Sequence, residues 1–112
     1  MQGQKEAENF LRKKGYAILQ QNFRVRAGEI DLIAQDNEYI VFVEVKYRHG
    51  AGHGLPSESV GLYKQRKICK TALYYISMCG LADQDFRFDV VEVLGGGGKV
   101  VINHIENAFD YV

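Results

Sequence analysis

Apolar residues recur at helical spacing in two separate stretches of the chain. Between Gln4 and Gly15 they fall mainly on one face, and Gly15 stands where a glycine commonly ends a helix. A second, longer helix is predicted from Pro56-Ser57-Glu58 to about Gly80, because a proline and polar residues precede an amphipathic run. Its predicted buried stripe consists of Leu62, Ile68, Ala72, Tyr75 and Ile76.

The remaining segments alternate apolar and polar residues, as strands do. Asp36-Asn37 predicts a tight turn between the second and third strands, and Gly95 to Gly98 predicts a turn between the last two. The glycine-rich segment 50–54 predicts a loop. The five predicted strands are residues 16–25, 28–35, 39–47, 86–94 and 99–104.

The order helix, three strands, helix, two strands predicts a single α/β domain over residues 1–112. A helical crossover would place the fourth strand beside the third, and the helices would cover the faces of the sheet. A chain of 112 residues can bury a sufficient core without disulfides. Cys69 and Cys79 are accordingly expected to be separate, reduced thiols.

Composition and charge narrow the classes of function. No apolar run approaches the roughly 20 residues of a membrane helix, so a cytoplasmic protein without membrane contact is expected. The net charge is zero, which argues against indiscriminate nucleic-acid binding. The charge nevertheless alternates in blocks, +4 in residues 1–26, −3 in 27–48, +3 in 49–80 and −4 in 81–112. The basic blocks are either solvated helix faces or two basic walls around an acidic centre that holds phosphates near a metal.

The predicted hairpin carries more charge than central strands usually do. On its first strand, Glu29 and Asp31 are expected on one face and Ile30 and Leu32 on the other. Charges inside a small sheet are costly unless they pair with each other or bind a metal.

On the next strand, Glu44 and Lys46 share a face, opposite to the valines of the same strand. Asp31 and Glu44 would then lie on neighbouring strands, within reach of one cation. One interpretation is an ion-pair network in which Lys46 compensates both carboxylates. The other is a magnesium site with Asp31 and Glu44 as ligands, to which Glu29 could add a third carboxylate. Lys46 would then orient or deprotonate the attacking water, or stabilise charge on a phosphate.

Two sequence runs in this hairpin resemble the metal-binding core of the PD-(D/E)XK nuclease superfamily. They are Gly28 to Ala34 (GEIDLIA) and Val41 to Lys46 (VFVEVK). More closely, the chain resembles the YraN-like family of uncharacterised bacterial proteins, which are related in fold to archaeal Holliday-junction resolvases. The resemblance implies a restriction-endonuclease-like α/β fold in three layers, with a central mixed five-stranded sheet flanked by helices. It covers nearly the whole chain and includes Phe10-Leu11, Lys14-Gly15-Tyr16, Asn22-Phe23-Arg24, Lys64-Gln65-Arg66 and Arg87 to Val91.

The resemblance also implies roles for individual residues. Asp31 and Glu44 would bind Mg²⁺ or Mn²⁺, and the Val45 carbonyl would be a third ligand. Lys46 would be the catalytic lysine. Gln65 would help to position the site or the phosphate.

One departure from the family lies in the first helix. The family carries a glutamate where this chain has Gln4, and in the resolvases a glutamate of the first helix completes the acidic cluster. Glu6 and Glu8 lie nearby in the sequence and are the candidates to take its place.

The leading hypothesis is a metal-dependent endonuclease that hydrolyses DNA phosphodiester bonds and selects branched, Holliday-junction-like DNA by shape. No base-reading motif stands out, so basic side chains are expected to contact phosphates. A homodimer would place two sites on opposing strands, as the resemblance to resolvases suggests. The alternatives are a nucleic-acid-binding module with impaired catalysis and a structural domain whose hairpin charges pair with one another. The expected phosphate contacts are Lys13, Lys14, Arg24, Arg26, Lys64, Arg66, Lys67 and Lys70.

Other polar and aromatic residues fit structural roles better. Arg87 and Asp89 share a strand face and are expected to form scaffold ion pairs. His49 and His53 have the spacing of a zinc pair on a helix, but the glycines between and after them favour a substrate-contacting loop. The second helix also carries tyrosines that fit a core or interface role better than base stacking. They are Tyr63, Tyr74 and Tyr75.

Overall fold

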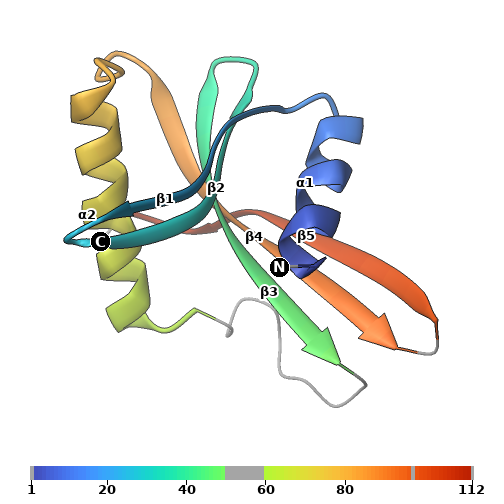
Figure 1. The fold of residues 1–112 in the computed structure, drawn as a ribbon. Helices are drawn as coiled ribbons and strands as arrows, with labels where there is room; N and C mark the ends of the chain where they lie inside the picture. Colours follow the sequence, from blue (N-terminus) through green and yellow to red (C-terminus); the bar gives the residue numbers. More distant parts are fainter. Residues whose placement is uncertain (1, 50–59, 97, 112) are drawn as a thin grey trace.

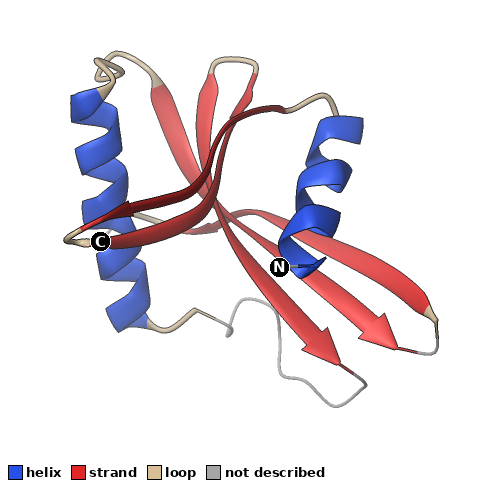
Figure 2. Cartoon of the chain, in the orientation of Figure 1, coloured by secondary structure: helices blue, strands red, loops and turns tan. Residues whose placement is uncertain are grey.

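The computed structural model describes residues 2–49, 60–96 and 98–111, which form two helices and five strands (Figures 1 and 2). The strands follow one another across the sheet in sequence order; β3 and β4 run parallel, and the other neighbouring pairs run antiparallel. Helix α1 covers one face of the sheet and α2 the other (Figure 1). This confirms the predicted α/β class and is consistent with a restriction-endonuclease-like fold. The elements are α1 (Gln2–Lys13), β1 (Ala17–Val25), β2 (Gly28–Asp36), β3 (Tyr39–His49), α2 (Leu62–Met78), β4 (Asp85–Gly96) and β5 (Lys99–Phe109).

The last strand is longer than the sequence pattern indicates. It was expected to end at His104, but β5 continues to Phe109. Asn107 has a positive φ of 52° and its N–H donates to Oδ1 of Asp89 at 3.0 Å, where the register between β4 and β5 shifts. This irregularity interrupts the alternation of apolar and polar residues, so the pattern stops before the strand does.

Helix α2 begins at Leu62, with Gly61 in an extended conformation as its N-cap. The start expected at residues 56–58 lies outside the described residues, as does the loop expected at residues 50–54. Within the described parts of the chain, no helix has both the length and the apolar character needed to span a bilayer.

The buried face of α2 is predicted correctly except at its start. Ile68 and three of the other expected positions are buried, whereas the side chain of Leu62 is 52% exposed. Leu62 precedes Ile68 by six positions, which is about 240° around a helix with 3.6 residues per turn. The positions one turn before Ile68 on the sheet-facing side are Lys64 and Gln65 instead.

The tyrosines and cysteines of α2 and its C-cap have different environments. Tyr75 is buried in the core, as expected, but Tyr63 and Tyr74 are 77% and 55% exposed. Cys69 is buried and Cys79 is exposed, and both are free thiols, which confirms the expectation that they do not pair.

Both faces of the sheet are packed with apolar side chains. On β3, Ile40 and Phe42 belong to the core under α2, and Val41 and Val43 belong to the core under α1. A strand covered on both faces is apolar at successive positions, as β3 is up to Val43. Glu44 continues the row that faces α2, so its carboxylate enters a buried position as the predicted alternation requires.

Strand β2 changes its facing at Asp31. Ile30 packs in the core under α2, whereas Leu32 packs in the core under α1, so the expectation that these two share a face is wrong. Asp31 lies across from Asn22, which has a positive φ of 51°, and the register of β2 with β3 ends at the pair Leu32 and Val43. The outer half of the β1–β2 hairpin therefore leaves the sheet and runs toward α2 (Figure 1).

The far end of this hairpin packs directly on α2. A Cβ atom added to Gly28 would lie 3.0 Å from Oγ1 of Thr71 and 3.7 Å from Cβ of Lys67. Glycine permits this close approach because it has no side chain. Farther along, the rings of Phe23 and Tyr75 meet edge to face at 5.2 Å between centroids. Hairpin and helix are thus held at a fixed separation.

A polar network is buried on the α1 side of β4. Asp89 is fully buried and lies 2.8 Å from Nε2 of His104 and 3.0 Å from Nε of Arg87. Arg87 also pairs with Asp36 at 3.2 Å, so the predicted scaffold role of Arg87 and Asp89 is confirmed. Burial opposes ionisation of Asp89, but its hydrogen bonds from His104, Arg87 and the Asn107 N–H outweigh burial and hold its pKa below the ordinary value.

Replacing Asp89 with asparagine is expected to lower the free energy of unfolding at pH 7 by about 3–5 kcal/mol, because the buried Arg87 loses a charged partner. Urea unfolding followed by circular dichroism measures the change. Asp83→Asn, at an exposed turn position, is the control and should change stability by less than about 0.5 kcal/mol. An effect of Asp89→Asn no larger than the control would mean that Asp36 and Glu106 neutralise Arg87 without it.

Candidate active site

Four residues predicted to carry chemistry meet where β2 leaves β3. Asp31 at the bend, with Glu44, Val45 and Lys46 on β3, lines a cavity of about 200 Å³. Both helices contribute to the same cavity. The other lining residues are Gly3 and Gln4 of α1, Tyr47 of β3 and Lys64 of α2.

Asp31 is held in place by the backbone of the neighbouring strand. Its Oδ2 accepts a hydrogen bond of 2.8 Å from the N–H of Val45. Burial, together with the adjacent carboxylate of Glu44, raises the pKa of Asp31 from 3.8 to about 6, although the Val45 N–H partly opposes this shift. Two carboxylates are thus forced close together in a poorly hydrated place.

Glu44 is only 5% exposed, and two ammonium groups neutralise it. Nζ of Lys46 lies 3.5 Å from Oε2, and Nζ of Lys64 contacts the same oxygen. Burial opposes charge on Lys64, but Glu44 outweighs burial and holds the pKa of Lys64 above its ordinary value. Both lysine side chains remain partly exposed, so each can reach an anion that enters the cavity.

The Val45 carbonyl points into the same region. In a β-strand, the N–H and C=O of one residue point toward the same neighbouring strand. The N–H of Val45 is directed at Asp31, so its carbonyl oxygen is directed to that side as well. Because the pairing of β2 with β3 ends at Val43, this carbonyl lies beyond the last paired position.

These donors suit a small divalent cation. Mg²⁺ and similar ions prefer oxygen ligands, and often take one or two carboxylates and fill the other positions with water and phosphate oxygens. Asp31, Glu44 and the Val45 carbonyl supply such a set. Among the described residues, no group of three His, Cys, Asp or Glu side chains comes together. His53 and the side chain of His49 lie outside the described residues.

The accessory acidic residues do not line this cavity. Glu29 is exposed on the outer hairpin and pairs with Arg24 at 2.7 Å. Oε1 of Glu8 accepts a hydrogen bond of 2.7 Å from Gln21 on β1. Glu6 is also absent from the lining residues. Gln4, which stands where the family carries a glutamate, does line the cavity.

The side chain of Gln65 does not line the cavity. At the start of α2, its Nε2 donates a hydrogen bond of 2.9 Å to the carbonyl of Val60. Its neighbour Lys64 lines the cavity instead. The sequence identified Lys64 only as a phosphate contact and missed its ion pair with Glu44. The spacing of four residues between Lys64 and Ile68 is the signal that places Lys64 on the sheet-facing side.

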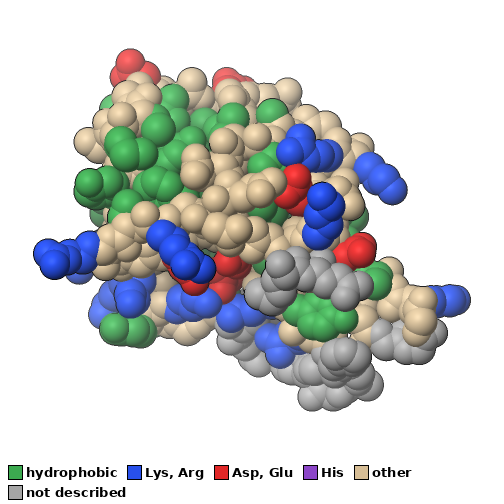
Figure 3. All heavy atoms as spheres, in the orientation of Figure 1, with side chains coloured by type: hydrophobic (Ala, Val, Ile, Leu, Met, Phe, Trp, Pro, Cys, Tyr) green, Lys and Arg blue, Asp and Glu red, His purple; other side chains and the backbone are tan. Residues whose placement is uncertain are grey.

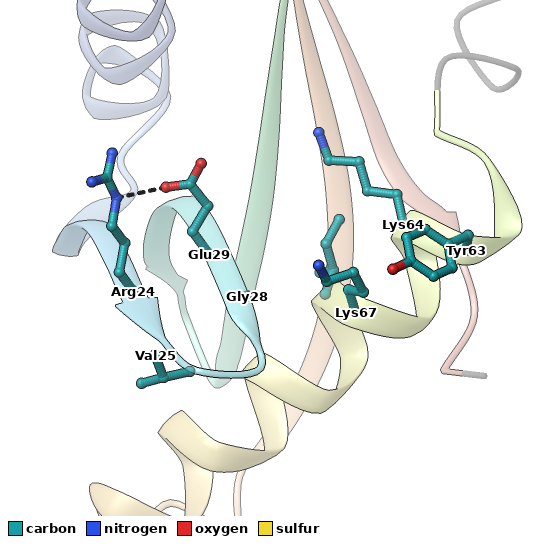
Figure 4. Close-up of a pocket in the computed structure, with 8 residues that line it drawn as sticks. Arg24, Val25, Gly28, Glu29, Tyr63, Lys64 and Lys67 are labelled. Atoms are coloured by element: carbon teal, nitrogen blue, oxygen red, sulfur yellow. Dashed lines mark hydrogen bonds and ion pairs between the residues drawn. The ribbon is translucent and has the colours of Figure 1, made fainter.

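Most of the predicted phosphate-binding residues gather on one side of the molecule. Arg24, Lys64 and Lys67 line a groove of about 570 Å³ between the β1–β2 hairpin and the first turns of α2 (Figure 4). Arg66 and Lys70 line a neighbouring depression of about 560 Å³, together with Lys67. Figure 3 shows Lys and Arg side chains crowded at the lower left of the molecule, where the hairpin turn and the start of α2 lie. Arg26 is exposed in the turn of this hairpin.

Lys13 and Lys14 lie elsewhere, at the opposite end of α1 from the cavity. Lys13 is about 14 Å along the helix axis from Gln4, at 1.5 Å rise per residue. Nζ of Lys14 lies 2.9 Å from Nδ1 of His104 on β5. The described structure therefore has one basic wall beside the cavity, formed by α2 and the hairpin, and a separate basic site at the end of α1.

The mixed sheet between two helices, with an acidic pair and two lysines where two strands part, is consistent with a protein of the restriction-endonuclease-like class. The sequence profile of "Uncharacterised protein family UPF0102" matches residues 3–93. The chain belongs to this family, which is the YraN family that its sequence resembles.

Individual members of the family are similar to this chain over most of their length. The chain is 46% identical over 108 residues to a UPF0102 protein of Clostridium acetobutylicum, covering 96% of this chain and 83% of that protein. It is 48% identical over 110 residues to a UPF0102 protein of Caldanaerobacter subterraneus, covering 96% and 90%. These names assign no activity.

Replacing Asp31 with asparagine is expected to raise the melting temperature at pH 8 in EDTA and to raise it clearly less at pH 4.5. Because folding raises the pKa of Asp31 to about 6, the stabilising effect of protonation is fully present below 3.8 and is lost as the pH rises through 6. Asparagine removes the charge and keeps an oxygen for the Val45 N–H. Thermal unfolding between pH 4.5 and 8 measures the effect, with Asp83→Asn as the control. A difference that does not vary with pH would contradict it.

Proposed function

We propose that this protein is a metal-dependent nuclease that hydrolyses phosphodiester bonds in DNA, with Mg²⁺ or Mn²⁺ as cofactor. One observation carries the proposal: Asp31, Glu44 and Lys46 line a single cavity beside a basic groove. Paired carboxylates suit a divalent cation, and the basic groove suits the polyanion on which such a cation acts.

The chemistry divides between the cation and the side chains. A bound divalent cation supplies a water of lowered pKa and a positive charge against the phosphate. Asp31, Glu44 and the Val45 carbonyl would hold that cation. The ammonium group of Lys46 is placed to orient the attacking water or to stabilise the charge that develops on the phosphate. Lys64 can contact a neighbouring phosphate when it leaves Glu44.

The substrate follows from the surroundings of the cavity. The cations of α2 and the hairpin would contact phosphates, which position a nucleic acid without reading its sequence. Selection by shape, as for branched or Holliday-junction-like DNA in the cytoplasm, fits this arrangement. A two-fold homodimer would present two such cavities to opposing strands.

A second function is a nucleic-acid-binding module with impaired catalysis. It is favoured by Gln4, because an amide lines the cavity where the family carries a glutamate. An amide is a weaker ligand for a hard cation than a carboxylate. With glutamine in place of glutamate, the site also holds one negative charge fewer.

Cleavage of labelled single-stranded, duplex, flapped and four-way DNA with Mg²⁺ or Mn²⁺ tests the nuclease proposal. Lys46→Met is expected to reduce the cleavage rate at least about a hundredfold, because it removes a charge placed against the transition state. Lys99→Met, at the exposed start of β5, is the control and should cleave like the wild type. Equal rates for Lys46→Met and wild type would reject the assignment of Lys46.

If the wild type cuts none of these substrates but retards one of them in a gel, the binding module replaces the nuclease. If it neither cuts nor binds, and neither cation raises its melting temperature, Asp31, Glu44 and the two lysines form a structural ion-pair network.

Replacing Gln4 with glutamate is expected to tighten Mn²⁺ binding about tenfold or more, because a third carboxylate joins the cavity. Since the cation binds only the folded protein, the Mn²⁺-induced rise in melting temperature should be larger than in the wild type. Asn9→Asp adds the same charge on an exposed position of α1 and is the control. Equal shifts in the two variants would show that position 4 does not contribute to the cation site.

A further inference from the structure

The groove between the β1–β2 hairpin and α2 combines an apolar floor with a cationic rim. Val25 and Ile68 supply apolar surface, while Arg24, Lys64 and Lys67 supply positive charge. Figure 4 shows Arg24, Val25 and Glu29 on the hairpin side of the groove and Tyr63, Lys64 and Lys67 on the α2 side. A surface that only neutralised phosphates would not need apolar lining, so this groove suits a ligand with both apolar and anionic parts.

Tyr63 gives the groove an aromatic wall. Its side chain is 77% exposed and lines the groove, and Nζ of Lys67 lies 5.6 Å from its ring centroid. An exposed tyrosine beside cations offers a stacking surface to a nucleobase whose phosphates contact those cations. The bases of a duplex are stacked on one another and cannot use such a surface, whereas unpaired bases can.

Lys64 joins this groove to the acidic cavity. It lines both of them, and its ammonium group contacts Glu44. A chain lying in the groove would therefore have a phosphate next to the paired carboxylates. The groove carries three cations against one carboxylate, Glu29, which is already paired with Arg24. The net charge favours a polyanion.

We propose that this groove binds a single-stranded DNA segment, with one base stacked on Tyr63 and its phosphates on Lys64, Lys67 and Arg24. This inference rests on the proposed nuclease function and names its substrate class, DNA with an unpaired arm that leads to the cavity.

Binding can be measured without cleavage, by fluorescence anisotropy of a labelled single-stranded 12-mer and a 12-base-pair duplex in EDTA. Tyr63→Ala is expected to weaken single-strand binding about tenfold and duplex binding less than twofold. Tyr63→Phe should keep wild-type affinity, because the ring does the stacking. Tyr74→Ala removes another exposed tyrosine from the same helix, outside the groove, and should leave both affinities unchanged.

Lys67→Met is expected to weaken binding of both ligands and to reduce the slope of log affinity against log salt concentration by about 1, because one phosphate contact is lost. Unchanged single-strand affinity in Tyr63→Ala, or an equal loss for single strand and duplex, would overturn the stacking site.

The groove and the nuclease activity can fail separately. Metal-dependent cleavage of duplex DNA that Tyr63→Ala does not impair, with unchanged single-strand binding, would reject the groove and leave the nuclease. Tyr63-dependent single-strand binding without cleavage of any substrate would reject the nuclease and keep the groove as a binding site.

Discussion

At the centre of this molecule, the side-chain carboxylate of Asp31 takes the place of a backbone carbonyl as hydrogen-bond acceptor. Where β2 parts from β3, the N–H of Val45 would be left without a backbone acceptor, and Oδ2 of Asp31 accepts its hydrogen bond instead. A buried, unsatisfied N–H is costly, so this single contact allows the sheet to open without that penalty. The freed half of the hairpin turns toward α2 (Figure 1). The acidic cavity and the basic groove are the two sides of this opening.

The same contact creates an electrostatic problem that is not fully resolved within the protein. Asp31 must stay close to Glu44 in a buried place, and its pKa rises to about 6 as a result. Lys46 and Lys64 compensate Glu44, but both remain partly exposed to solvent. A site assembled in this way is already arranged around negative charge before any ligand arrives, which is the form of preorganisation that favours cation binding and phosphate chemistry.

The sequence predicts those parts of the fold that follow a regular period. Alternation on β3 correctly places Glu44 on the face opposite Val41 and Val43, because this strand stays regular and is covered on both faces. The flip at Asp31 and the extra length of β5 beyond His104 were not predictable from period alone, since a positive φ or a bulge follows from tertiary hydrogen bonds. For the candidate site, the hairpin motif located Asp31 and Glu44, whereas the ion pair of Lys64 depends on the rotation of α2 about its axis.

Gly28 sets the distance between the hairpin and α2, because it has no side chain to hold the two apart. Backbone and helix touch at this point, where a methyl group would approach Oγ1 of Thr71 to 3.0 Å and displace its neighbours by a few tenths of an ångström. The aperture between hairpin and helix is therefore set by direct contact of two regular elements, without an intervening loop. A larger residue at position 28 would push the hairpin away from α2 and so change the width of the groove without replacing any of its charged or aromatic side chains.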